Sequence, residues 1–170
     1  WLEFYATAFA AEKLASWGYE LKMGRDIIKE GEQLLLPAEE TLQAEFDRAL
    51  KAGGKIEYLE RSRGGFTGVV ATIKGEQSGP TVAFRFDIDS NEVMESTEST
   101  HRPAASGFQS ANPGYAHMCG HDVHTATGLL LARYFAANRK KIKGTVKFIF
   151  QPNEENLSGA SAMVAAGVVD

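Results

Sequence analysis

Residues 145–150 read Thr-Val-Lys-Phe-Ile-Phe, a β-branched and aromatic run that is typical of a buried strand. Residues 81–86, Thr-Val-Ala-Phe-Arg-Phe, have the same character. A helix is expected between them, at about 125–137. A strand, a helix and a second strand in this order favour parallel pairing through a right-handed crossover. We therefore expect these two strands to be neighbours in one mostly parallel sheet.

The flanking sequence adds further helices and short strands. Pro37 suits the first turn of a helix, with Glu39 and Glu40 near the positive end of its dipole. Apolar spacing and glycine stops predict helices at 2–17, 37–52 and 159–166, and strands at 20–23 and 69–74. This alternation predicts a layered α/β domain in which a mostly parallel sheet is flanked by helices.

Composition limits the classes of protein to which this chain can belong. The chain has 170 residues, 44% hydrophobic and 24% charged, which suits one globular domain. Its net charge of −4 argues against a nucleic-acid partner, and no apolar run approaches membrane-spanning length. The single cysteine, Cys119, excludes an internal disulfide. We therefore expect a cytoplasmic protein without a membrane partner, in which Cys119 is free for metal or redox chemistry.

The densest cluster of chemical groups lies at residues 117–124, His-Met-Cys-Gly-His-Asp-Val-His. Thiolate and imidazole are good ligands for zinc and related divalent metals. Gly120 lets the backbone turn so that Cys119 and His121 can point to one place. His124 shares a face with His121 if a helix has begun there. A polar loop whose histidines only form hydrogen bonds is the alternative, and the density of ligand types favours metal.

Two acidic pairs lie near predicted strand ends. Glu154 and Glu155 follow one strand, where one carboxylate could bind metal while the other takes a proton from water. Asp87 and Asp89 follow the other strand and share a face, from which they could orient a ligand histidine. An exposed acidic loop and a charged strand end are the alternatives. Ligands of open α/β sheets bind beyond the carboxyl ends of strands, so we expect convergence on one crevice.

Two other chemistries compete for Cys119. With a nearby histidine it could be a thiol nucleophile, but that leaves Glu154 and Glu155 without a role. It could instead belong to a structural zinc site in a non-enzymatic α/β module, but a closed structural site needs no spare carboxylate. Catalytic metal ligation accounts for all of these residues.

The three motifs, in this order, resemble the M20 metallopeptidase family, in its aminoacylase-like branch of amidohydrolases. The matching segments are residues 84–89, 117–125 and 150–155, followed by Gly159-Ala160 and Met163-Val164. The resemblance covers nearly the whole chain and implies two bound Mn²⁺ or Zn²⁺ ions. The resemblance implies that the metal ligands are Cys119, His121 and Glu155. It implies that Glu154 is the general base and that Asp89 is a second catalytic residue. The residues that it implies to line or support the site are Asp87, Asp122 and His124.

The resemblance also implies a reaction, the metal-dependent hydrolysis of the amide bond of small N-acyl or N-aroyl amino acids, with aminobenzoyl-glutamate favoured. A homodimer or a heteromer with a related subunit is expected. The family draws further histidine ligands from beyond its Glu-Glu motif and has a smaller lid domain. We therefore expect residues 1–170 to be a partial catalytic domain with little activity alone. A catalytically incompetent, metal-binding fragment or degenerate homologue is the alternative.

This sequence departs from the family pattern beside its motifs. Ser90, Asn91 and Glu92 stand where Ala-Leu and often Pro are usual, and Asn153 and Asn156 stand where small residues are commoner. None of these is an expected ligand, so the departures concern substrate fit more than metal binding.

Overall fold

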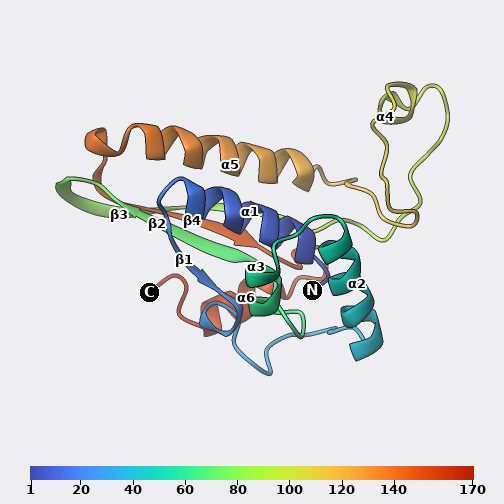
Figure 1. Cartoon of the computed structure of the whole chain (residues 1–170), viewed down its shortest axis with the longest axis horizontal. Helices are drawn as coiled ribbons and strands as arrows, with labels where there is room; N and C mark the ends of the chain where they lie inside the picture. The colour runs from blue at the N-terminus through green and yellow to red at the C-terminus, as the bar shows by residue number, and fades with distance from the viewer.

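The structure is a computed structural model that describes residues 1–170, and it contains a single four-stranded sheet with helices packed on both faces (Figure 1). The strands are β1 (Glu20–Met23), β2 (Val69–Lys74), β3 (Gln77–Asp87) and β4 (Lys143–Gln151). The helices are α1 (Phe4–Ser16), α2 (Glu39–Lys51), α3 (Ile56–Arg61), α4 (Arg102–Ala105), α5 (His121–Ala137) and α6 (Gly159–Ala165), with 3₁₀ turns η1 (Gly24–Asp26) and η2 (Arg139–Lys141).

The sheet has the order β1-β2-β4-β3 and is mixed. β3 and β4 are neighbours and parallel, with Phe86 opposite Phe150, which confirms that part of the sequence prediction. β1 pairs antiparallel with β2, and β2 pairs antiparallel with β4. The expectation of a mostly parallel sheet is therefore wrong, although the α/β layering is confirmed.

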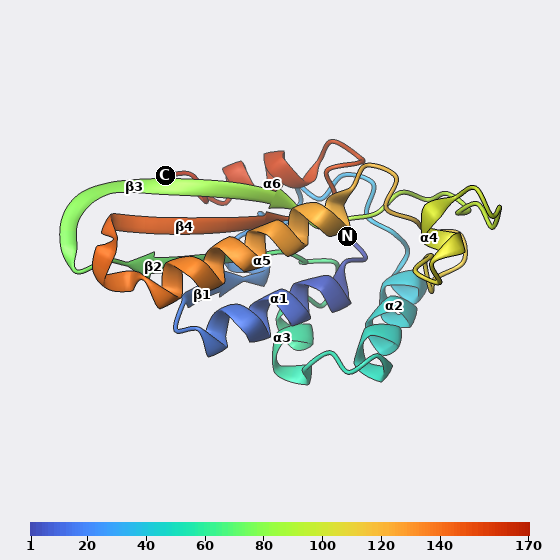
Figure 2. The same cartoon turned by 90° about the horizontal axis from the view of Figure 1, so that it is seen from above.

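The path of the connections explains the antiparallel pairs. The long β1–β2 connection returns to the end of the sheet that it left, because Met23 at the end of β1 pairs with Val69 at the start of β2. Its helices α2 and α3 pack beside α1 instead of crossing the sheet (Figure 2). Only Gly75 and Glu76 separate β2 from β3, and β4 is inserted between these strands. The β3–β4 connection, which carries α5, is the one that returns along the sheet and gives a parallel pair.

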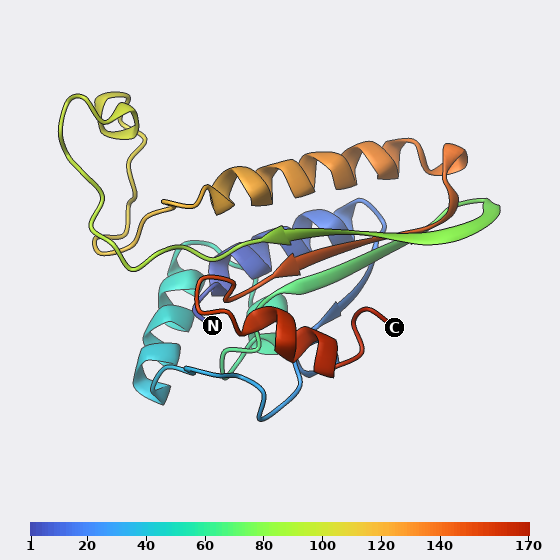
Figure 3. The same ribbon diagram turned by 180° about the vertical axis from the view of Figure 1, so that it is seen from behind.

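The pleat of the strands divides the core into two layers. Val69, Phe148 and Phe150 belong to the cluster on the face covered by α1 and α5. Val70 and Ile149 alternate with them and pack with Met163 of α6 on the opposite face (Figure 3). Full burial of a phenylalanine contributes about 1.5–3 kcal/mol. The sheet is therefore fixed from both sides near the carboxyl ends of β3 and β4.

Three local differences from the sequence prediction position the site. Helix α5 begins at His121, one turn earlier than expected. Asp87 is the last residue of β3 and does not follow it. The short helices α3 and α4 have no counterpart in the sequence prediction, and α4 sits in an excursion that projects from the body of the molecule (Figure 1). None of the helices has the length and apolar character to cross a bilayer.

Candidate active site

Three segments meet where β3 and β4 end. β3 closes with the buried Asp87, and Asp89 lies two residues beyond it, also buried. β4 ends at Gln151, which places Glu154 and Glu155 in the next loop. His121, the first residue of α5, faces both of these carboxylates. The parallel strands β3 and β4 thus place acidic groups at one edge of the sheet, and the imidazole of α5 lies beside them.

His121 is held in one orientation by Asp89. The His121 Nδ1 lies 2.9 Å from Asp89 Oδ1, and the residue is only 8% exposed. An ionised carboxylate accepts hydrogen bonds, so Nδ1 carries the proton and Nε2 keeps its lone pair in the neutral ring. Nε2 lies 3.8 Å from Glu154 Oε2. A carboxylate behind a histidine in this way is the usual support for a metal-ligating imidazole.

Asp89 also fixes the Glu-Glu loop. Its second oxygen, Oδ2, accepts a hydrogen bond of 2.8 Å from the backbone N–H of Glu155. Burial raises the pKa of Asp89, while that backbone hydrogen bond acts in the opposite sense. One carboxylate therefore joins β3, α5 and the loop after β4.

His121, Glu154 and Glu155 form a trio of potential metal ligands. One ligand atom from each lies within 4.8 Å of the other two. The Oε1 atom of Glu155 is buried without a hydrogen-bond partner, which is costly for a carboxylate unless a cation compensates. Nitrogen and oxygen donors of this kind suit Zn²⁺ or Mn²⁺. The residues present therefore fit a divalent metal site.

Hydrogen bonds to Asn153 hold the loop that carries the two glutamates. Asn153 has a left-handed backbone with φ of 51°, and its Nδ2 donates to Ser158 Oγ over 2.6 Å. The Asn153 backbone N–H donates to Glu3 Oε1 over 2.8 Å, and Thr67 Oγ1 donates to the other Glu3 oxygen over 2.7 Å. Burial would raise the pKa of Glu3, but these hydrogen bonds act in the opposite sense, and the pKa is lowered overall. Sequence reasoning missed Glu3, because a glutamate beside the first turn of a helix normally faces solvent.

Cys119 lies beside the trio and is not part of it. The thiol is exposed, and its Sγ accepts a hydrogen bond from Asn91 Nδ2 over 3.6 Å. Hydrogen bonding to Glu155 raises the pKa of Cys119, and the contact with Asn91 acts in the opposite sense. Gly120 follows with φ of 76°, the left-handed turn that the sequence predicts between Cys119 and His121.

The remaining predicted residues lie at the margin of this cluster. His124 accepts a hydrogen bond of 3.1 Å at Nδ1 from the backbone N–H of Asp87. The Oδ1 atom of Asp87 is buried and 3.2 Å from Arg85 Nη1, without hydrogen-bond geometry. Asp122 is exposed, and its side chain forms no hydrogen bond or ion pair. Asp87 and His124 thus support each other one helical turn from His121, while Asp122 takes no part in the site's contacts.

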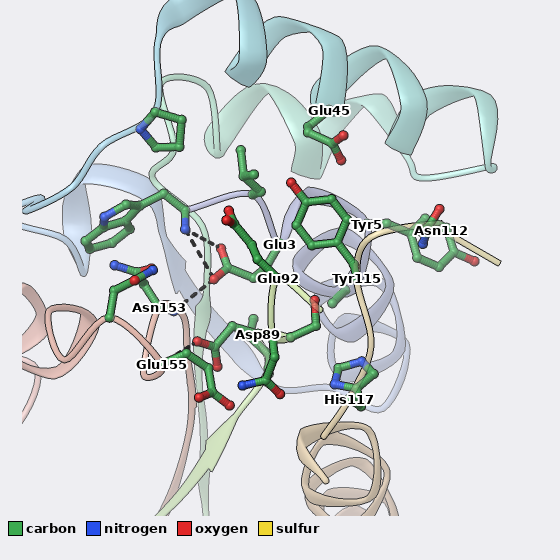
Figure 4. Close-up of a pocket in the computed structure, with 18 of the residues that line it drawn as sticks. Glu3, Tyr5, Glu45, Asp89, Glu92, Asn112, Tyr115, His117, Asn153 and Glu155 are labelled. Carbon is green, nitrogen blue, oxygen red and sulfur yellow. Dashed lines mark hydrogen bonds and ion pairs between the residues drawn. The ribbon is translucent and has the colours of Figure 1, made fainter. Parts of the chain in front are cut away.

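A cavity of about 940 Å³ opens beside Glu155, which is the member of the trio that lines it. Figure 4 shows Asp89 and Glu155 at one end of it, with Tyr5, Glu45 and Asn112 toward the other. Arg48 also lines the cavity, where its guanidinium is paired with Glu45 and donates to Asn112 Oδ1 over 2.8 Å. The cavity is large enough for a small molecule and has both aromatic and polar walls.

Comparison with known proteins places this geometry in a family. Over all 170 residues the chain is 45% identical to one of the subunits of p-aminobenzoyl-glutamate hydrolase from Escherichia coli K12. Over the same length it is 46% identical to indole-3-acetyl-aspartic acid hydrolase of Enterobacter agglomerans. The chain covers 39% of the length of each relative.

Solved structures give the same assignment. An aminobenzoyl-glutamate utilization protein from Klebsiella pneumoniae matches 99% of the chain with a TM-score of 0.78 at 39% identity, the chain covering 36% of that protein. The YXEP protein of Bacillus subtilis, a dinuclear metal binding peptidase of the M20 family, matches 96% of the chain with a TM-score of 0.63 at 31% identity, the chain covering 33% of it. Residues 83–170, which contain every predicted site residue, match peptidase family M20/M25/M40, and the chain belongs to that family.

Proposed function

We propose that this chain is part of the catalytic domain of a metal-dependent amidohydrolase that cleaves N-acyl or N-aroyl amino acids. The observation that carries the proposal is the trio His121, Glu154 and Glu155, whose ligand atoms lie within 4.8 Å of one another. The carboxylate of Asp89 behind His121 supports it. Relatives named N-acyl-L-amino acid amidohydrolase and N-acetylcysteine deacetylase, 44% and 43% identical over parts of the chain, support the reaction class.

The ligands on this chain would be His121 through Nε2, Glu155 through its carboxylate and Cys119 as a thiolate. When bound, two divalent ions such as Mn²⁺ or Zn²⁺ supply positive charge that activates the amide carbonyl and the attacking water. His121 is pre-oriented because Asp89 holds its Nδ1 proton, and Glu155 is pre-oriented because Asp89 accepts its backbone N–H. Both residues are therefore held by hydrogen bonds within the protein, without a bound ion.

Glu154 is the proposed general base. Its side chain is 34% exposed, more than the 21% of the Glu155 side chain, so it is the more accessible of the two carboxylates to a water molecule. A Glu154 carboxylate oxygen takes a proton from the water that attacks the amide carbon. The same oxygen then returns that proton to the leaving nitrogen as the C–N bond breaks. Asp89 contributes by orienting His121 and Glu155 during these steps.

Aminobenzoyl-glutamate is the proposed substrate. The names of the two relatives at 45% and 46% identity both describe an aromatic acyl group joined to an acidic amino acid. Tyr5 and Tyr115 line the cavity and offer apolar surfaces for an aromatic ring. The first of these relatives is named as one subunit of its hydrolase, which supports assembly with a related chain. We propose that arrangement for the parent protein.

The competing interpretations of Cys119 fit less well. A nucleophilic cysteine needs a depressed pKa, but hydrogen bonding to Glu155 raises the pKa of this thiol. A closed structural zinc site would bury its thiolate among four protein ligands, but Cys119 is exposed. A ligand at the open side of a catalytic site agrees with both observations.

The test uses the full-length parent protein and aminobenzoyl-glutamate. We expect release of aminobenzoate and glutamate with added Mn²⁺ or Zn²⁺, and loss of activity with a chelator that returns when metal is restored. The isolated 170-residue chain should be much less active, since three side-chain ligands are few for two ions. Unchanged turnover after complete removal of metal would contradict the proposal.

A further inference from the structure

Asn91 lies at the base of the excursion that carries α4, two residues beyond Asp89. Its backbone forms an isolated antiparallel bridge with Ala116. The Asn91 N–H donates to the Ala116 carbonyl over 2.9 Å, and the Ala116 N–H donates back over 3.1 Å. The two ends of the excursion are therefore joined just before the Cys119 segment, while α4 projects outward (Figure 1).

The Asn91 side chain uses both ends of its amide on the same segment. Its Oδ1 accepts from the backbone N–H of Met118 over 3.0 Å and from that of Cys119 over 3.3 Å. Its Nδ2 donates to Cys119 Sγ over 3.6 Å. Because two adjacent backbone N–H groups point to one end of the Asn91 amide, that end must be the oxygen, and the amide nitrogen therefore faces the sulfur. One side chain thus restrains both the backbone and the thiol of Cys119.

Little else holds Cys119 in place. The neighbouring Met118 side chain is 61% exposed, so this stretch is not anchored by burial. Gly120 has no heavy atom within 4 Å of the position of a Cβ, so the following turn is also open. The hydrogen bond that orients the thiol comes from Asn91 Nδ2.

We propose that Asn91 is a positioning residue that sets Cys119 in place as a metal ligand beside Glu155. The proposal rests on the proposed metal-dependent function. The role requires an acceptor and a donor on one short side chain. Leucine offers neither, and aspartate keeps the acceptor but replaces the donor with a negative oxygen facing the sulfur. Asparagine is therefore the residue type that satisfies all three contacts.

The test substitutes Co²⁺ in the full-length protein, because a cobalt–thiolate bond gives a charge-transfer absorption that reports directly on Cys119. The variants are Asn91→Leu and Asn91→Asp, and the control is Asn112→Leu, which loses a contact to Arg48 in the same cavity wall. We expect Asn91→Leu to lose most of the thiolate band and to bind metal about 10–100-fold more weakly, the usual effect of removing a group that orients a ligand. Asn91→Asp should keep its fold and still weaken the band.

A second readout needs no metal. In metal-free protein, the rate of alkylation of Cys119, measured by mass spectrometry of its peptide, should differ several-fold between Asn91→Leu and the parent, whereas Asn112→Leu should match the parent. Parent-like bands, metal affinities and alkylation rates in both Asn91 variants would overturn the proposal. A parent protein without any thiolate band would refute Cys119 as a ligand and this inference with it. A parent with the band but no hydrolysis would refute only the proposed activity.

Discussion

Asp89 and His121 are joined through Oδ1 and Nδ1 over 2.9 Å, while the other Asp89 oxygen accepts the backbone N–H of Glu155 over 2.8 Å. The two acceptors of one carboxylate thus fix two proposed metal ligands that are 34 positions apart in the chain. The arrangement needs a group that accepts twice and donates nothing, which is a property of ionised aspartate.

Asp89→Asn keeps the size of the side chain but turns one acceptor into a donor. Its amide NH₂ must then face either the His121 Nδ1–H or the Glu155 N–H, and one of these contacts becomes repulsive. We expect metal affinity to fall about 10–100-fold, with a comparable loss of turnover at limiting metal. Metal titration by calorimetry measures the first effect. Asp122→Asn, which removes an exposed carboxylate next to His121, should bind metal like the parent, and equal losses in both variants would contradict the role of Asp89.

Glu154 and Glu155 are adjacent but should respond differently to substitution. Glu154→Gln removes the proposed proton acceptor and keeps the shape, so metal content should remain while turnover falls about 10²–10⁴-fold. Glu155→Gln and Cys119→Ala should instead lower metal content, because they remove proposed ligands. Elemental analysis beside product release separates the two outcomes. Full turnover by Glu154→Gln would refute its assignment as the base.

Local patterns predict the strands that carry the site. The predicted bounds of β4 agree with the observed ones within two residues, because β-branched and aromatic runs are local signals. β3 begins four residues before the predicted 81–86 and ends one residue after it, while the bounds of β2, beside the site strands, equal the predicted ones. The antiparallel pairing of β2 cannot be predicted in this way, since it depends on α2 and α3 packing beside α1, which no local pattern encodes. The six-residue α3 is too short to show helical periodicity.

The residues of the site also fall into two groups, those that the sequence predicts and those that only the fold reveals. His121, Glu154 and Glu155 come from short motifs whose chemistry can be read in the sequence, and the structure brings them together. Their roles stay predictions. Glu3 and Asn91 act across large sequence distances, on Asn153 and Cys119 respectively, through hydrogen bonds that depend on the fold. In the sequence Asn91 is only a departure from the family pattern. Its hydrogen bonds to the Cys119 segment, which give it a structural role, become visible only in the fold.

Gly128 is where α5 comes closest to the sheet. A Cβ there would lie 2.8 Å from ring atoms of both Phe86 and Phe150. Helix propensity alone favours Gly128→Ala by about 1 kcal/mol, but overpacking against two core rings costs about 1–3 kcal/mol. We expect the steric effect to prevail and the variant to unfold at lower urea concentration. Val123→Ala, on the exposed side of the same helix, should change stability by less than about 0.5 kcal/mol. A stabilised Gly128→Ala protein would show that α5 can move off the sheet at little cost.

Tyr19 should make the protein sensitive to alkaline pH. Its ring is 6% exposed, and its hydroxyl donates to the Ala132 carbonyl of α5 over 2.7 Å. Burial raises the pKa of Tyr19 far above its ordinary value of 10.0, because the phenolate would lose its hydration. A group whose pKa is raised in the folded state stabilises that state fully below the unfolded pKa, and this contribution is lost as the pH rises toward the folded pKa.

The expected result for Tyr19→Phe therefore has two parts. At pH 7 the variant loses one hydrogen bond and about 0.5–1.5 kcal/mol of unfolding free energy. Above about pH 10 the parent loses up to about 1.4 kcal/mol per pH unit through Tyr19, and the variant loses nothing through this position. The difference between parent and variant should shrink and then reverse, as measured by urea unfolding across that range. Tyr134→Phe, which alters an exposed tyrosine on α5, keeps Tyr19 and should follow the parent's alkaline decline. A constant difference between Tyr19→Phe and the parent at every pH would mean that Tyr19 ionises as readily in the folded protein as in the unfolded chain.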